Sequence, residues 1–328
     1  MPVPSVGPLR ELLQVEWGPK PHDPPVLIGP GATGSANALI VLRRTAFVPD
    51  APDHVELPKQ AGQALLRWAQ DHDLGQVDEQ VRAVSKRREY ALDQFRAQGK
   101  HVARVLLTPE WRVTVGLGEK ANTHELGLSL HGTYGWPVIP GSSLKGVTAA
   151  YAWDRFQHAA KGREVFRKIF GSPLPPPRAE AEKRQAGKDR TARGAQADGT
   201  AREEQYSGAG ADRTDAQRGT VRFLDAFAAG SPVTVSVDVL TPHVKPYYDT
   251  TREEREGVVP HPPAEHHQPV PVQFLTVAAG SFAADLVGDT EQDIKYAAHW
   301  LCQAVEDLGV GAKTAAGYGY MKVQRSTG

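Results

Sequence analysis

Between about Leu57 and Lys100, apolar residues recur at the three- and four-residue spacing of an amphipathic helix, with charged residues between them. Gly75 interrupts this pattern and predicts a break into two helices. We expect residues 1–101 to form an N-terminal segment whose accessory helices are laid on a main domain. The residues that carry the helical spacing are Leu65, Leu66, Trp68, Val77, Val81, Val84, Leu92 and Phe95.

Near Val102 the pattern changes to short alternating runs, each typical of a strand, with helical stretches between them. From Val105 the essential order is strand, helix, strand, strand, helix, strand, which is the split βαβ pattern of a ferredoxin-like, RNA-recognition-type fold. The predicted class is α+β, with this domain spanning residues 102–328. The expected strands are Trp111–Val115, Thr220–Leu224, Val233–Val239, Val272–Val277, Ser281–Val287 and Tyr318–Val323, and the expected helices are Gly141–Phe156, Arg163–Phe170 and Glu291–Leu308.

Large apolar residues almost disappear between Ser172 and Gly219, where a run of prolines leads into alanine, glycine and charged residues. Such a segment cannot bury enough apolar surface to offset the entropy that it loses on ordering. We therefore expect residues 172–219 to be a flexible, disordered insertion in the second domain. A solvated loop is the preferred interpretation over a partner-binding segment.

The charge balance limits the kinds of partner that the chain can bind. Its 38 lysines and arginines are matched by 38 aspartates and glutamates, so the formal net charge is +0. A protein that coats nucleic acid alone is usually basic, so any nucleic-acid surface here must be local.

The single cysteine, Cys302, excludes an internal disulfide and lies in an apolar helical stretch, which indicates a buried thiol. No apolar run is long enough for a membrane span, so we expect a cytoplasmic protein without a membrane partner.

Near the C-terminus, a glycine-rich run extends from Gly309 to Gly319 and contains Lys313 and Thr314. Glycine permits positive φ and leaves amide groups uncovered, which is how a backbone forms a nest for phosphate. In a nucleotide-binding P-loop such a run follows a strand, opens a helix and has glycine before the lysine. Here Ala312 precedes the lysine and the expected order is helix, loop, strand. The run is therefore not a Walker loop.

Three stretches together resemble the RAMP superfamily of CRISPR effector proteins. The first runs from His124 to Gly146 and ends in Pro-Gly-Ser-Ser-Leu-Lys-Gly. The second combines Phe223–Ala226 with Asp238–His243, and the third is the glycine-rich run. They occur in the family's order across Val105–Val323. Within the superfamily they look most like the sixth subunit of the Cmr-type (type III-B) RNA-targeting complex.

This resemblance implies a non-catalytic backbone subunit that binds the CRISPR guide RNA. Such a subunit sits at the end of a protein filament, toward the 3′ region of the guide, and contacts target RNA only indirectly. Its expected partners are the other RAMP subunits and the small helical subunit of the same complex. Target cutting belongs to the repeating backbone subunit in these complexes. The resemblance implies no cofactor.

A guide of variable sequence must be held through phosphate and sugar, since base contacts would restrict which guides bind. Glycine amides, lysines and serine hydroxyls at a helix N-terminus suit that task. In a βαββαβ fold the two loops that offer these groups can converge at one side of the sheet, so we predict one RNA site. Its expected residues are Gly141, Ser142, Ser143, Lys145, Gly309, Gly311, Lys313, Thr314, Gly317 and Tyr318.

Plainer structural roles compete with this interpretation. A serine directly before a helical pattern is a good N-cap, so Ser142 and Ser143 can serve the helix alone. Gly317 and Gly319 can serve only tight packing. Tyr318, Tyr320 and Trp136 are candidates for base stacking, but the alternation of a strand makes core packing at least as reasonable for one of the two tyrosines.

Other functions remain open. Some RAMP proteins are endoribonucleases that process CRISPR transcripts, and His124, His131 and His243 are candidates for assisting attack by a 2′-hydroxyl. A nucleotide-binding enzyme and a scaffold that binds only protein are two further alternatives. We expect no metal site, because the adjacent His266 and His267 point in different directions. Asp225 and Asp238 lie at or near strands, where a carboxylate that caps a turn is expected rather than a two-metal pair.

Overall fold

The computed structural model describes residues 3–4, 12–16, 23–43, 59–117, 127–172, 217–241 and 271–325. The expectations for His124, for residues 242–270 with their histidines, and for the interior of the insertion fall outside these residues. The described helices are α1 (Ala38–Arg43), α2 (Lys59–Asp71), α3 (Asp78–Ala97), α4 (Gly141–Phe156), α5 (Ala160–Phe170) and α8 (Glu291–Asp307), with 3-10 turns η2 (Asp73–Gly75) and η5 (Thr314–Ala316). The described strands are β1 (Val3–Pro4), β2 (Gln14–Glu16), β3 (Val26–Ile28), β4 (His101–Pro109), β5 (Val221–Phe223), β6 (Phe227–Ala228), β7 (Thr234–Leu240), β8 (Val272–Ala279), β9 (Phe282–Gly288) and β10 (Met321–Arg325).

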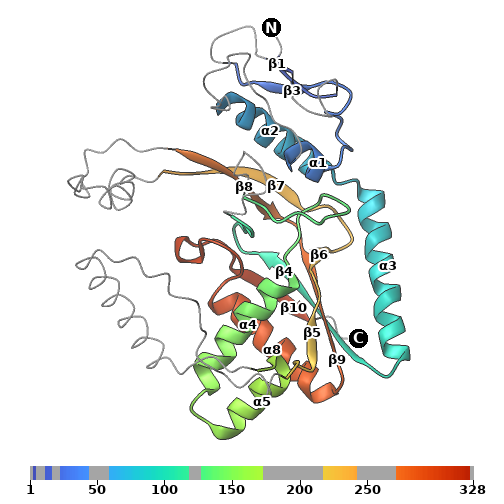
Figure 1. The fold of residues 1–328 in the computed structure, drawn as a ribbon, viewed down its shortest axis with the longest axis vertical. Coiled ribbons are helices and arrows are strands. Elements are labelled where there is room, and N and C mark those ends of the chain that lie inside the picture. The colour runs from blue at the N-terminus through green and yellow to red at the C-terminus, as the bar shows by residue number, and fades with distance from the viewer. Residues whose placement is uncertain are drawn as a thin grey trace, which may run out of the picture.

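The central sheet has the strand order β10-β4-β9-β5, and all of its neighbours are antiparallel. Val105 pairs with Ala284 and Leu107 with Phe282, and all four are buried. Neighbouring residues of a strand point to opposite faces, so these four share one face, under α4 and α8. These two helices lie side by side on the sheet (Figure 1). The predicted mixed α and β class is confirmed.

The N-terminal segment packs against a separate two-stranded sheet, β7–β8, through α2 (Figure 1). Gly75 separates α2 from α3 as predicted, with φ of 72°, and a Cβ there would collide with the carbonyl oxygen of Ala36. Buried apolar residues form one cluster that runs from Leu13 in this segment to Met321 in β10. The N-terminal segment and the central sheet therefore share a hydrophobic core.

Side chains of α2 and η2 cover the outer edge of β7. The Oδ1 atom of Asp73 accepts a hydrogen bond from the amide of Val235 at 2.8 Å, and Oε1 of Gln70 accepts one from Val237 at 2.8 Å. Gln76 accepts from the amide of Val233 and donates to its carbonyl. An uncovered strand edge is a template for pairing with other chains. The N-terminal segment satisfies this edge.

The strand predicted at Trp111–Val115 is wrong. The strand at this point is β4, which ends at Pro109 and is paired on both sides, whereas the following segment makes only an isolated bridge between Val113 and Val277. Val113, Thr114 and Val115 are all buried, because the segment is enclosed by β8 on one side and by the glycine-rich run on the other. The alternation that resembled a strand reflects this enclosure.

Most other elements lie where the pattern predicted them. The helices expected at 141–156, 163–170 and 291–308 are α4, α5 and α8, and the last strand, β10, begins three residues later than expected. The ends of the expected insertion are held together, since the amide of Ser172 donates to the carbonyl of Gln217 at 2.9 Å. Residues 173–216 themselves lie outside the described chain.

Cys302 is buried as predicted, and burial raises the pKa of its thiol. Among the helices that the structure describes, none has the length and apolar character that crossing a membrane requires. In the same residues, no group of three or more histidine, cysteine or acidic side chains is arranged to hold a metal ion.

Candidate nucleic-acid interface

The glycine-rich run, Gly309–Gly319, is a loop that joins α8 to β10, as predicted. We call it the glycine loop. Its four glycines at 309, 311, 317 and 319 all have positive φ, between 72° and 100°, and so does Lys313 at 59°. Each of these residues turns the backbone in a sense that L side chains rarely adopt. The loop is therefore compact, and the element order of a P-loop is absent from it.

The glycine loop is fixed on the segment that follows β4. The amide of Ala312 donates to the carbonyl of Thr114 at 2.8 Å, and the amide of Gly319 donates to that of Arg112 at 2.8 Å. A Cβ at Gly311 would collide with the carbonyl oxygen of Thr114. Gly311 is thus required for close approach of two backbones, and the loop cannot shift without breaking these bonds.

Part of the loop backbone stays uncommitted. The amides of Gly311, Lys313, Thr314 and Ala315 have no hydrogen-bond partner within the part of the chain that the structure describes. Gly311, Lys313 and Ala315 are exposed, and Thr314 is half-buried. Free amides beside a lysine ammonium form the kind of nest that accepts phosphate oxygens.

The second predicted group lies at the start of α4, where the expected serine cap is wrong. The N-cap residue is Pro140, and Oδ1 of Asp225 accepts a hydrogen bond from the amide of Gly141 at 2.7 Å. Asp225 is thus a capping carboxylate, as expected, but it caps α4. A Cβ at Gly141 would collide with the carbonyl oxygen of Phe223. Ser142 is exposed in the first turn of the helix.

The two predicted groups are linked through two intervening segments of the chain. The glycine loop bonds to Thr114, Ser129 donates to the carbonyl of Val115, and Val138 donates to that of Ser129. Residues 112–115 and 127–130 therefore lie between the loop and the chain that enters α4. Among the described residues, no hydrogen bond joins the loop directly to Ser142, Ser143 or Lys145, and the convergence of the two groups on one RNA site stays a prediction.

Tyr318 is a correction to the predicted site. Its side chain is 3% exposed, and its hydroxyl donates to Oδ2 of Asp238 at 2.7 Å. Burial, together with this hydrogen bond, raises the pKa of Tyr318 to about 12. A ring this buried cannot stack on a base. Trp136, at 5% exposure, is excluded for the same reason, and the tyrosine that packs in the core is Tyr318.

Pattern reasoning missed a pocket of about 480 Å³ between α3, the 131–136 turn and the start of β6. Arg87, Arg88, His131, Tyr134 and Asp225 are among its lining residues. Arg87 donates to the hydroxyl of Tyr134, whose ring stacks on His131 at 4.8 Å between centroids. These residues come from three distant parts of the sequence, so no local spacing pointed to them.

The model of the RAMP superfamily matches residues 105–322, which is most of the chain. This chain belongs to the RAMP superfamily. A relative, the CRISPR system Cmr subunit Cmr6 of Pyrococcus furiosus, is 30% identical over 230 residues, which cover 63% of this chain. The chain spans 64% of that relative's length. The predicted resemblance to the RAMP superfamily and to the sixth Cmr subunit is confirmed.

A structural neighbour is a chain of the type III-B Cmr-beta complex bound to cognate target RNA, solved by cryo-EM. It superposes on this RAMP protein with a TM-score of 0.54 and 16% identity, covering 85% of this chain and 79% of the other. At this level of identity the likeness establishes the shared fold.

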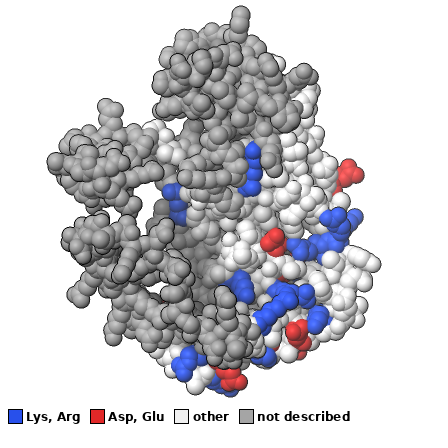
Figure 2. Space-filling model, in the orientation of Figure 1, with Lys and Arg blue, Asp and Glu red and all other residues white. Residues whose placement is uncertain are grey.

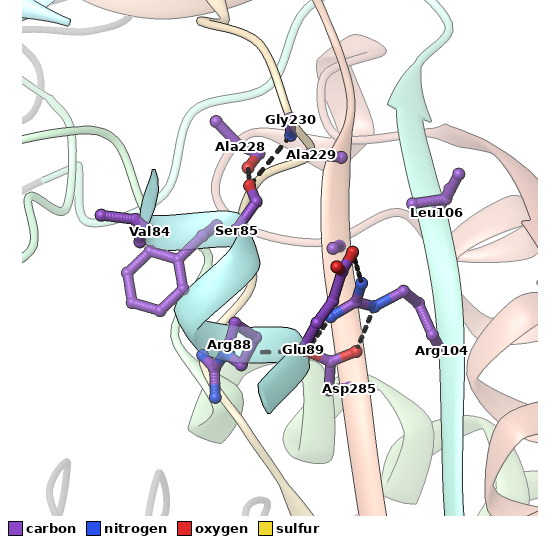
Figure 3. Close-up of a pocket in the computed structure, with 12 residues that line it drawn as sticks. Val84, Ser85, Arg88, Glu89, Arg104, Leu106, Ala228, Ala229, Gly230 and Asp285 are labelled. Atoms are coloured by element: carbon purple, nitrogen blue, oxygen red, sulfur yellow. Dashed lines mark hydrogen bonds and ion pairs between the residues drawn. The ribbon is translucent and has the colours of Figure 1, made fainter. Parts of the chain in front are cut away.

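On the other face of the RAMP sheet, α3 is fastened by a buried carboxylate. Arg104 on β4 donates from Nε to Oδ1 of Asp285 on β9 at 2.7 Å, and the Asp285 side chain is 0% exposed. Arg88 of α3 lies 3.7 Å from the same carboxylate, and Glu89 binds Arg104 from the solvent side (Figure 3). This arrangement holds α3 against the sheet and lines a second pocket of about 250 Å³ (Figure 3), and Arg88 also lines the pocket that contains His131.

The charges on the visible face are mixed. Figure 2 shows lysine and arginine side chains gathered over the lower right, where Figure 1 places α3, β5 and β9, with carboxylates between them. Several cations of the described surface are paired, as in the Lys100–Asp289 contact at 2.7 Å. The face in Figure 2 therefore offers local cationic positions interspersed with carboxylates.

Proposed function

We propose that this RAMP protein is a non-catalytic, guide-RNA-binding backbone subunit of a type III-B CRISPR effector (Cmr) complex, acting in antiviral defence against foreign RNA. It would lie at the end of the filament, near the 3′ region of the guide. The 30% identity to Cmr6 supports this proposal, as does the fold shared with a chain of the RNA-bound Cmr-beta complex. The proposed partners are the guide RNA, other RAMP subunits and the small helical subunit, with target RNA contacted indirectly.

The domain that carries this function is inferred to be ferredoxin-like and to span residues 102–328, with residues 1–101 as an accessory segment. In a split βαβ unit the strands follow the order fourth, first, third, second. The sheet order β10-β4-β9-β5 supports the inference, because these are the last, first, third and second strands of that unit. A flexible insertion at 172–219 remains part of the proposal.

The observation that carries RNA binding is the glycine loop. Its amides at Gly311, Lys313, Thr314 and Ala315 lack partners among the described residues, and the Lys313 side chain is exposed beside them. Phosphate contacts of this kind hold RNA without reading its sequence, which suits a guide that differs from one complex to the next. Lys145 and the first turn of α4 are proposed to hold the same RNA.

For the alternative, a RAMP-family endoribonuclease, the geometry of His131 argues against this histidine as the base, while His124 and His243 lie outside the described residues. Its Nδ1 atom accepts hydrogen bonds from the amides of Thr133 at 3.2 Å and Tyr134 at 3.4 Å. The neutral ring therefore carries its proton on Nε2 and has no free lone pair for a 2′-hydroxyl proton. Burial lowers the pKa of this imidazole, which further favours the neutral ring.

Purification of the tagged full-length chain from its native cells, with sequencing of bound RNA and mass spectrometry of its partners, tests the proposal. We expect guide RNAs of defined length together with other RAMP subunits. Lys313→Ala should reduce the RNA recovered, whereas Lys161→Ala, which removes an exposed lysine on α5, should not. RNA-free protein without partners would contradict the proposal. Cleavage of CRISPR repeat RNA that depends on a histidine would favour the endoribonuclease.

A further inference from the structure

Trp111 is an unusually exposed tryptophan directly after β4. It is 52% exposed, whereas Trp68, Trp136 and Trp300 are 4%, 5% and 6% exposed. Leaving so large an apolar ring half in water forfeits much of the burial energy that a tryptophan side chain offers. Trp111 precedes Arg112, whose carbonyl is bonded to the glycine loop, so its exposed ring is a candidate for contact with the same RNA.

The ring of Trp111 is supported from below. It packs on Tyr318 with centroids 4.9 Å apart, and Tyr318 packs in turn on Phe274 at 5.8 Å. The guanidinium of Arg112 lies 5.5 Å from the Trp111 ring. These three residues and Trp111 form a column that begins in β8 and ends at the surface.

Asp238 fixes this column. Its Oδ2 atom accepts from the Tyr318 hydroxyl at 2.7 Å and pairs with Nη1 of Arg112 at 3.1 Å. Both groups that support Trp111 are thus held by one carboxylate. Trp111 remains 52% exposed beside these two contacts, so the supported ring is an aromatic platform that solvent reaches.

The platform adjoins the nest of the glycine loop. The amide of Gly319 donates to the carbonyl of Arg112, next in sequence to Trp111, and Ala312 donates to Thr114. The uncommitted amides of Lys313 and Thr314 belong to the chain between these two anchors. The indole and the free amides therefore belong to two segments that these hydrogen bonds join.

We propose that Trp111 stacks on a base of the single-stranded RNA whose phosphate occupies the glycine loop. The inference rests on the proposed function and adds to it a base contact that reads no sequence. Every nucleobase has a π face, so a stacking platform tolerates any guide, as the phosphate nest does. Together they would fix one nucleotide at two points, and its base would be turned toward the protein.

Fluorescence anisotropy with the full-length chain tests the platform, using labelled oligoadenylate RNA and the same RNA with abasic riboses. Trp111→Ala and Trp111→Leu should each weaken oligoadenylate binding by about 5- to 150-fold, the usual range for losing one stacked base. Trp111→Phe should retain most of the affinity, because it keeps a ring. Glu110→Ala, which changes the exposed preceding residue, should not weaken binding.

Abasic RNA separates stacking from support of the loop. If Trp111 stacks on a base, wild type should bind abasic RNA weakly, and Trp111→Ala should cause no further loss. Equal affinity of wild type and Trp111→Ala for oligoadenylate would overturn the proposal, and so would an equal loss on both RNAs. Wild-type protein that binds neither RNA, or whose binding ignores Lys313→Ala, would instead contradict the proposed phosphate site.

Discussion

Lys313 is the one non-glycine residue of the glycine loop with a left-handed backbone, at φ 59° and ψ 32°. For an L residue this conformation costs about 1–2 kcal/mol. Four glycines in the same loop avoid that cost, so folding alone does not favour a lysine here, and the proposed phosphate site would account for it. At position 313 the backbone conformation thus favours glycine, whereas the proposed phosphate contact favours lysine.

Lys313→Gly and Lys313→Ala should therefore behave differently in stability and alike in binding. Glycine adopts the left-handed backbone without strain, whereas alanine does not. The unfolding free energy of Lys313→Gly should therefore exceed that of Lys313→Ala by about 1 kcal/mol. Both remove the proposed phosphate contact, so both should weaken RNA binding and lower the slope of log affinity against log salt by about 1. Urea unfolding and salt-dependent anisotropy measure the two effects. A glycine variant that binds as wild type does would show that the ammonium is dispensable.

His131 gives the fold a pH dependence of known sign. Burial lowers the pKa of its imidazole, with Arg88 and Arg87 adding to the effect and Asp225 opposing it. The folded state therefore prefers the neutral ring. This stabilisation is complete above the unfolded pKa near 6.5 and is lost as the pH falls toward the lowered folded value.

Lowering the pH from about 7.5 to 5.5 should thus reduce the unfolding free energy of wild type more than that of His131→Gln, which cannot be protonated. His158→Gln, a change at an exposed histidine, should keep the wild-type dependence. Urea denaturation at the two pH values measures the difference. Parallel loss in wild type and His131→Gln would assign the pH effect to other groups.

At the scale of elements, α4 shows how a distant residue completes a helix. Asp225 follows β5 and reaches the Gly141 amide from 84 positions away. Asp225→Ala should destabilise the protein by about 0.5–2 kcal/mol, the usual cost of losing an N-cap. Ser142→Ala, in the exposed first turn, should cost much less. Urea unfolding measures the stability of both variants. A larger loss of unfolding free energy in Ser142→Ala than in Asp225→Ala would identify the serine as the cap of α4.

Periodicity alone located α4, α8 and most strands, because their apolar faces follow the 3.6- and two-residue repeats of helix and strand. It failed where residues are buried by contacts with distant segments rather than by lying in a regular helix or strand. Val113, Thr114 and Val115 are enclosed by β8 and the glycine loop, and that enclosure imitates a strand pattern. Likewise Trp111 and the Asp225 cap depend on contacts between distant segments, which no local spacing encodes.

At the scale of the whole molecule, the N-terminal segment is a structural part of the RAMP protein rather than an appendage. Its residues share the core, and Gln70, Asp73 and Gln76 occupy the backbone groups along the edge of β7. The described ends of the insertion, in contrast, are already bonded to each other at Ser172 and Gln217. The two segments should therefore respond differently to deletion.

Removing residues 1–99 uncovers buried apolar surface together with the β7 edge, so the shortened chain should self-associate or precipitate. Replacing residues 173–216 with a short glycine-serine linker should leave a monodisperse chain of nearly wild-type stability. The hydrogen bond between Ser172 and Gln217 is kept, and closing a shorter loop costs less entropy. Size-exclusion chromatography with light scattering, followed by thermal unfolding, distinguishes the two deletions. A soluble, cooperatively folded chain lacking residues 1–99 would mean that the central sheet is stable without the N-terminal segment. Loss of folding in the linker variant would mean that residues 173–216 contribute to the core.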